Sequence, residues 1–115
     1  MVKVVSIFKL KPGFDPDDSY RLWLEEHTAY VKAKLKPELK KYLIGRVVTN
    51  LGEKVEEFGF GVVELFFEDV DSALRAMNRL WSVPGQARPN VEYDEFTRRI
   101  AVLRRAIIEE KEIEL

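Results

Sequence analysis

The order in which strand-like and helix-like runs follow one another most restricts the fold of this chain. Two runs place apolar residues at every third or fourth position, which is typical of amphipathic helices. They predict one helix from Asp15 to about Leu35 and a second over residues 71–81. Four other runs are rich in β-branched and aromatic residues, as strands are. These runs are residues 2–10, 39–50, 60–68 and 99–110, and the last would also suit a helix by composition.

The resulting order is strand, helix, strand, strand, helix, strand. It is the order of a ferredoxin-like α+β domain, in which four antiparallel strands carry both helices on one face. A chain of 115 residues, 46% of them apolar, is the usual size of one globular domain with a buried core. We therefore expect a single domain over residues 1–115.

Local signals mark where the helices begin and end. Asp15 is a good N-cap and Pro16 suits a first helical position, while Pro37 ends the same helix. Asp69 or Asp71 is the expected N-cap of the second helix. The loop that follows this helix is expected to contain one helical turn over residues 93–98.

Composition excludes several classes of function. The net charge of −1, from 19 basic and 20 acidic residues, gives no field that would attract nucleic acid. No apolar run approaches the roughly 20 residues that cross a bilayer, and without cysteine there are no disulfides and no thiolate chemistry. No zinc-protease or nucleophile-elbow motif is present. We expect a soluble, cytoplasmic protein without a metal or cofactor, and a charged fraction of 34% suggests a thermophile.

The alternation of side chains along the predicted strands divides the sheet into two faces. One set is apolar throughout, and the other includes Ser6, Tyr42, Arg46 and Glu64. We expect this second face to lie under the helices, around a small cavity, because polar groups do not fit a close-packed interface. The expected pocket residues are Ser6, Trp23, Arg46 and Phe66. The apolar face would then need a cover, and a second copy of the same sheet is the simplest one.

His27 is the only histidine in the chain, and it lies on the apolar stripe of the first helix. It is either a buried structural residue, bonded to backbone or to Glu64, or a general acid and base at neutral pH. Tyr42 is either a catalytic phenol or an aromatic strand residue with a solvated hydroxyl. Glu64 either forms an ion pair with Arg46, or acts as a base with a shifted pKa or as a residue that orients His27.

Two stretches resemble the EthD family. Residues 4–31 match its first strand, its Pro-Gly turn into the first helix and its Trp-x-x-x-His pattern, at Lys11-Pro12-Gly13-Phe14, Pro16, Tyr20, Trp23 and His27. Residues 61–77 resemble its third strand and second helix, including Glu64. The resemblance implies a dimeric α+β barrel, that is, a homodimer through the sheet face.

The resemblance also indicates a function. Related isomerases and aromatic polyketide cyclases transfer protons on small oxygenated rings, and a helix histidine and a second-strand tyrosine act together in some of them. His27 and Tyr42 occupy comparable positions here. We therefore expect a cofactor-free isomerase or cyclase with His27, Tyr42 and Glu64 as catalytic residues and a small apolar or aromatic ligand. Two alternatives stay open: a non-catalytic ligand-binding or stress-associated module, and a haem-handling monooxygenase with His27 as ligand.

Overall fold

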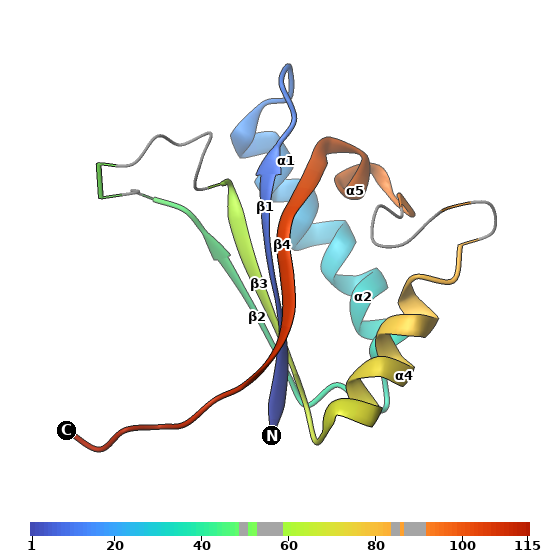
Figure 1. The fold of residues 1–115 in the computed structure, drawn as a ribbon. Coiled ribbons are helices and arrows are strands. Elements are labelled where there is room, and N and C mark those ends of the chain that lie inside the picture. The colour runs from blue at the N-terminus through green and yellow to red at the C-terminus, as the bar shows by residue number, and fades with distance from the viewer. Residues whose placement is uncertain (49–50, 53–58, 84–85, 87–91) are drawn as a thin grey trace.

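The computed structural model describes residues 1–48, 51–52, 59–83, 86 and 92–115 (Figure 1). The strands are β1 (Val2–Leu10), β2 (Lys41–Arg46), β3 (Gly61–Phe67) and β4 (Ile100–Glu109). The helices are α1 (Pro16–Leu22), the π-helical turn η1 (Trp23–His27), α2 (Thr28–Leu35), α4 (Val70–Leu80) and α5 (Glu95–Arg99). The predicted βαββαβ order is confirmed, with α5 as an added turn before β4.

The four strands form one antiparallel sheet in the order β2-β3-β1-β4. The helices cover one face of this sheet, and the opposite face, the outer face, carries none of them (Figure 1). This is the arrangement expected for the ferredoxin-like class. In the described part of the chain, no helix is both long enough and apolar enough to cross a membrane.

The first helix contains one wider turn. Asp15 caps it, accepting a hydrogen bond from the Asp18 backbone N–H at 2.8 Å, as predicted. The five residues of η1 then form a π-helical turn between α1 and α2. A π-helical turn holds more residues than an α-helical turn. Trp23 and His27, four positions apart, are therefore both turned toward the sheet and buried. Leu24, next to Trp23, is 45% exposed.

Two caps set the start of the later helices. The Asp69 carboxylate accepts from the Ser72 backbone N–H and begins α4, which decides between the two predicted caps. Asp94 does the same for α5 through the Thr97 N–H. The helical turn expected over residues 93–98 is therefore present at Glu95–Arg99.

The register of β3 shows that its side chains were assigned to the wrong faces of the sheet in the prediction. Residues paired across neighbouring strands point to the same side, and Ser6 is paired with Val63. The buried cluster under the helices accordingly contains Leu65 together with Val4. Glu64 and Phe66 lie on the outer face, where we had expected the apolar set. The prediction was right for β1 and β2 and wrong for β3.

Two groups of buried side chains fill the space between the sheet and the helices. The larger lies under α2 and α4 and includes Leu35, Phe67 and Met77. The smaller is aromatic and lies under α1 and η1, where Phe8 and Phe96 pack against Trp23 at ring distances of 4.9 and 5.2 Å. Members of both groups line the cavity described next.

Candidate active site

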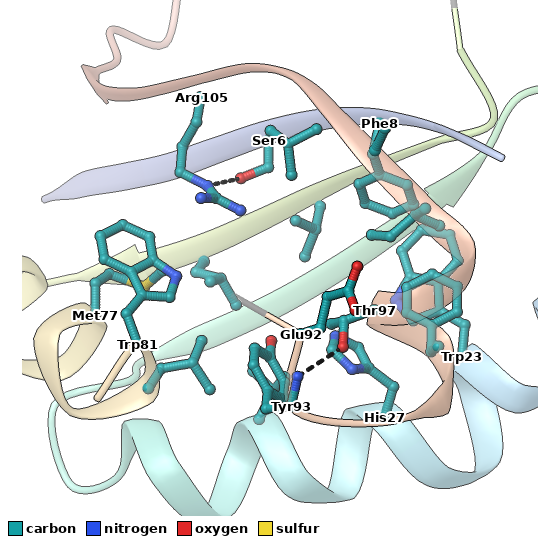
Figure 2. Close-up of a pocket in the computed structure, with 18 of the residues that line it drawn as sticks. Ser6, Phe8, Trp23, His27, Met77, Trp81, Glu92, Tyr93, Thr97 and Arg105 are labelled. Atoms are coloured by element: carbon teal, nitrogen blue, oxygen red, sulfur yellow. Dashed lines mark hydrogen bonds between the residues drawn. The ribbon is translucent and has the colours of Figure 1, made fainter. Parts of the chain in front are cut away.

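A cavity of about 210 Å³ lies between the helix-covered face of the sheet and the helices (Figure 2). Most of its wall is aromatic or aliphatic, from residues such as Phe8, Trp23, Met77 and Trp81. Polar side chains interrupt this wall at a few points: Ser6, His27, Tyr42, Thr97 and Arg105, with Lys11 and Glu92 among the remaining lining residues. A mainly apolar hollow with a few converging polar groups is the usual form of a small-molecule site.

His27 is buried and held by a carboxylate. Its Nδ1 lies 2.7 Å from Oδ2 of Asp94, and only 8% of the residue is exposed. Since an ionised carboxylate only accepts hydrogen bonds, Nδ1 carries the proton and donates it. Nε2 is then the basic nitrogen of the imidazole, as in the histidine–aspartate pairs of hydrolases. The rings of Tyr93 and Phe96 flank the imidazole at centroid distances of 5.6 and 4.8 Å.

Asp94 serves two neighbours at once. Oδ2 faces His27, while Oδ1 accepts from the Thr97 N–H at 2.8 Å as the N-cap of α5. Burial acts to raise the pKa of Asp94, but the hydrogen bond and charge of His27 and the bonds from Thr97 hold it below the ordinary value. The carboxylate therefore stays ionised near neutral pH and fixes both the position and the tautomer of the imidazole.

Tyr42 reaches the cavity from β2. Its hydroxyl is buried and makes no hydrogen bond with the described residues, because its contact with the Trp23 indole falls short of bonding geometry. Burial raises the pKa of this phenol well above its ordinary value, and Trp23 offsets only part of the effect. Burial likewise raises the pKa of Tyr93. Both phenols are therefore neutral at physiological pH, and the Tyr42 O–H is a donor without a partner among the described residues.

Arg105 enters the cavity from β4. Its Nε donates to Ser6 Oγ at 2.9 Å, and its guanidinium lies over the Trp81 ring at 4.9 Å from the centroid (Figure 2). Burial lowers the pKa of this group, although an arginine stays charged at any physiological pH. A second ion pair, Lys11 Nζ with Glu92 Oε1 at 3.2 Å, belongs to the lining between β1 and the segment before α5.

Four of the residues singled out from the sequence meet at this cavity. Ser6 and Tyr42 reach it from the sheet, and Trp23 and His27 from η1. The structure thus brings two of the three expected catalytic residues, His27 and Tyr42, to one cavity. Their catalytic roles remain predictions.

Three others lie elsewhere, and for Glu64 and Phe66 the reason is the register of β3. Glu64 sits on the outer face, where Lys3 Nζ contacts it at 2.7 Å, so neither the predicted pairing with Arg46 nor a bond to His27 is present. Phe66 lies on that same face, beneath the ammonium groups of Lys3 and Lys41. Arg46 is on the helix side but outside the cavity lining, stacked on Tyr20 and paired with Asp17. The expectation that these three line the pocket is wrong.

Asp94 and Arg105 are site residues that the sequence reasoning missed. Asp94 carried one local signal, since an acidic residue three positions before Thr97 can cap a short helix. Arg105 carried none, because Arg104 and Arg105 are adjacent and a strand sends one to each face. The segments 50–60 and 81–96 are described only in part, since residues 50, 53–58, 84–85 and 87–91 lie outside the described residues.

No family model and no curated protein matches this chain. Several solved structures share its fold. An EthD family protein from Bacillus halodurans is 16% identical, with a TM-score of 0.60, over 96% of this chain and 99% of its own. SnoaB, a cofactor-independent oxygenase from Streptomyces nogalater, is 13% identical with a TM-score of 0.60, over 97% and 94%. HapK from Hahella chejuensis is 13% identical with a TM-score of 0.61, over 100% and 97%.

At these identities the likeness establishes the fold. This chain has the α+β fold of an EthD family protein, which confirms the predicted ferredoxin-like fold, while the dimer stays a prediction. The reaction has to be argued from the residues of the cavity.

Proposed function

We propose that this chain is a cofactor-independent acid–base catalyst, of the isomerase or cyclase kind, acting on a small oxygenated ring compound. One observation carries the proposal: an imidazole oriented by a half-buried carboxylate lines a mainly apolar cavity. If His27 had a purely structural role, its hydrogen bond to Asp94 would be enough to satisfy the buried ring, and no cavity would be needed beside it. The similarity to SnoaB, named as a cofactor-independent oxygenase, is compatible with such a site.

The proposed step is a proton transfer at a carbon beside a carbonyl group. His27 Nε2 removes the proton, and the electron pair of the broken C–H bond moves onto the carbonyl oxygen as an enolate. The Tyr42 O–H donates a hydrogen bond to that oxygen, where negative charge develops. Asp94 stabilises the imidazolium, which then returns the same proton to another atom of the ring system. Nothing else is consumed, so the isomerisation is balanced without a cofactor.

The size of the cavity limits what can enter. A cavity of roughly 150 Å³ is known to hold benzene. About 210 Å³ therefore suits one or two fused rings with a polar substituent. A haem has four pyrrole rings in one macrocycle and is several times larger than benzene. The cavity does not fit it, and the haem-handling alternative has no support in this geometry.

The proton transfer is tested with β-tetralone, a two-ring ketone whose protons beside the carbonyl are acidic. Incubation in D₂O followed by NMR measures how fast the protein exchanges these protons for deuterium. His27→Gln should slow the exchange by about 10²- to 10⁴-fold, the usual contribution of a general base. Tyr42→Phe should slow it several-fold, because one donor to the enolate oxygen is lost.

Two further variants distinguish positioning from catalysis. Asp94→Asn retains a good helix cap but not the carboxylate that orients the imidazole, so the exchange should slow. Glu64→Gln, on the outer face, should leave the exchange unchanged and is the matched control. Exchange by His27→Gln at the wild-type rate, in a protein that still folds, would refute the proposal.

The aromatic wall also supports a second candidate, a module that binds a small apolar ligand without transforming it. Such a protein would bind β-tetralone, seen as a rise in melting temperature, and would not accelerate its exchange. The two candidates are separated by this one measurement.

We also propose that the outer face is covered by a second copy of the chain. Leu43 and Ile108 of this face are 42% and 39% exposed, and Val5, Ile7 and Val62 are only partly buried. In the middle of this face Lys3 contacts both Glu64 and Glu110, while Lys41 and Arg104 lie on the edge strands β2 and β4. An apolar face whose central charges are paired with one another suits contact with an identical face.

A further inference from the structure

The segment that follows β4 leaves the sheet, and we call residues 110–115 the arm. The arm belongs to no helix or strand, and it extends away from the body of the domain on the side opposite α4 (Figure 1). Within the described part of the chain, its one ion pair joins Glu110 to Lys3 Nζ at 2.8 Å. All of its side chains are exposed, and Ile113 is exposed to 70%. The apolar residues of the arm therefore take no part in the core of their own domain.

The arm has the sequence pattern of an extended segment with one buried face. Ile113 and Leu115 alternate with Glu112 and Glu114 along the chain. Successive side chains of an extended chain point to opposite sides, so one side of the arm is apolar and the other is acidic. Such a segment binds well along an exposed sheet edge where an apolar surface and a basic side chain lie next to each other.

The start of β2 provides a surface of this kind. β2 is an edge strand, and no described strand lies along its free side. Leu43 is 42% exposed on the outer face, while Lys40 and Lys41 are exposed at the start of the strand. Lys40 falls in the set opposite to Leu43 in the alternation of side chains. Glu38, the one carboxylate between residues 36 and 46, is paired with Arg79 at 2.7 Å. This surface is therefore basic, with an exposed apolar side chain beside the lysines.

The strand register places the arm and this surface at the same end of the sheet. Glu109, the last residue of β4, is paired with Val2, which is paired in turn with Phe67. Lys41, the first residue of β2, is paired with Phe66. The end of β4 and the start of β2 therefore lie at one end of the sheet, but at its two opposite edges.

A second copy of the chain brings the two together. If two sheets pack through their outer faces around a two-fold axis parallel to the strands, β2 of each copy lies opposite β4 of the other. Stacked sheets are about 10 Å apart, and six extended residues span about 20 Å, so the arm is long enough to cross.

We propose that the arm of each copy docks on the start of β2 in the second copy, with its carboxylates toward Lys40 and its apolar side chains toward Leu43. The proposal rests on the face-to-face dimer proposed above, and it adds a reciprocal contact that forms twice in each dimer. The opposite charges of the two surfaces favour this pairing over the approach of two like edges, because like charges in contact repel.

The first test removes the arm and measures the dissociation constant of the dimer by sedimentation velocity at several protein concentrations. A chain that stops at Glu109 should dimerise at least about tenfold more weakly than the full chain, because each dimer loses two arms with two apolar side chains apiece. A shortened chain that dimerises as tightly as the wild type would overturn the proposal and leave the contact between the sheets standing.

The second test exchanges the charges. Lys40→Glu should weaken the dimer several-fold at low ionic strength, and so should the pair Glu112→Lys and Glu114→Lys, because each change sets like charges against one another. A chain with all three substitutions has opposite charges again and should recover most of the lost affinity. Losses that simply add in the triple variant would contradict the proposed contact.

Lys32 provides a matched control for the charge reversal. It is exposed on α2, on the helix side of the sheet, where the proposed dimer makes no contact. Lys32→Glu should leave the dissociation constant unchanged. An equal weakening by Lys32→Glu and Lys40→Glu would show a general effect of net charge and would overturn the proposal.

Leu43→Asp separates the arm from the contact between the sheets, since it places a charge on the outer face and leaves Lys40 and the arm in place. It should dissociate the dimer if both proposals hold. A dimer that survives Leu43→Asp but dissociates when the arm is removed would support the arm and refute the contact between the sheets. A wild type that is monomeric at micromolar concentration would overturn both.

Discussion

The two faces of the sheet use polar side chains in opposite ways. On the outer face, Lys3 lies between Glu64 and Glu110 at 2.7 and 2.8 Å, so these three side chains pair with one another within the face. On the helix-covered face, Tyr42 and Arg105 project into a shared space, and the Tyr42 hydroxyl is buried without a hydrogen bond to the described residues. Both faces are otherwise apolar, so the composition of a strand alone does not distinguish them.

This difference indicates where a ligand and where a partner would bind. Polar groups that satisfy one another leave a surface that only needs to be covered, which suits a second protein chain. Polar groups that converge on a hollow cost free energy unless something in the hollow completes their hydrogen bonds. The helix-covered face is therefore the candidate site, and the outer face is the candidate interface.

The largest expected effect concerns the assembly. Leu43→Glu places a charge in the middle of the proposed interface, where it would be buried without a partner, and should convert a dimer into a monomer at micromolar concentration. Leu24→Glu is the control, because Leu24 is exposed to a similar degree, 45% against 42%, but lies on the helix side. Sedimentation velocity measures both. A wild type that is monomeric at micromolar concentration would rule out the proposed interface, and so would equal dissociation of the two variants.

The next effect contrasts two glycines of adjacent strands. A methyl group on Gly61 would lie 2.6 and 2.8 Å from two atoms of the buried Trp23 ring, so Gly61→Ala must displace a packed indole. Overpacking of this kind costs about 1–3 kcal/mol of unfolding free energy. At Gly45, on the outer face, the nearest atom is 3.8 Å away, and Gly45→Ala should be neutral or stabilise the fold by up to about 1 kcal/mol. Urea unfolding of both variants checks the contrast, and equal destabilisation would contradict it.

The sequence predicted the order of the elements because period-two and three-to-four patterns reflect local geometry. It did not predict which face of β3 meets the helices, since both sets of its side chains are largely apolar. By composition, the set with Val63 and Leu65 could be buried under the helices, and so could the set with Phe66. Only the pairing of Ser6 with Val63, which depends on the whole sheet, decides between them.

The site was predictable as far as each residue carried its own pattern. His27 and Trp23 stood out on an amphipathic helix, and Ser6 and Tyr42 on alternating strands. Asp94 contacts a residue 67 positions away, and no local pattern records such a contact. For β4, a shift in register between Ile7 and Phe8 interrupts the alternation, so even a correct strand assignment would not have placed Arg105 reliably.

The smallest expected effect is the dependence of stability on pH at the His27–Asp94 pair. The folded state lowers the pKa of Asp94 below its ordinary value of 3.8, so the ionised carboxylate stabilises the fold above that pH. This contribution is lost as the pH falls through the lower, folded-state value. The free energy of unfolding of Asp94→Asn should therefore lie below that of the wild type by a constant amount above about pH 5, and the gap should shrink below pH 4.

His27 should be responsible for part of that gap, because its hydrogen bond and charge both act to lower the pKa of Asp94. Urea unfolding of the wild type, Asp94→Asn, His27→Gln and the double variant at several pH values measures this share as a double-mutant cycle. A smaller gap in the His27→Gln background is the expected result. If the gap were the same in both backgrounds, Asp94 would stabilise the fold only as the N-cap of α5. Its hydrogen bond to His27 would then contribute nothing to the free energy of unfolding.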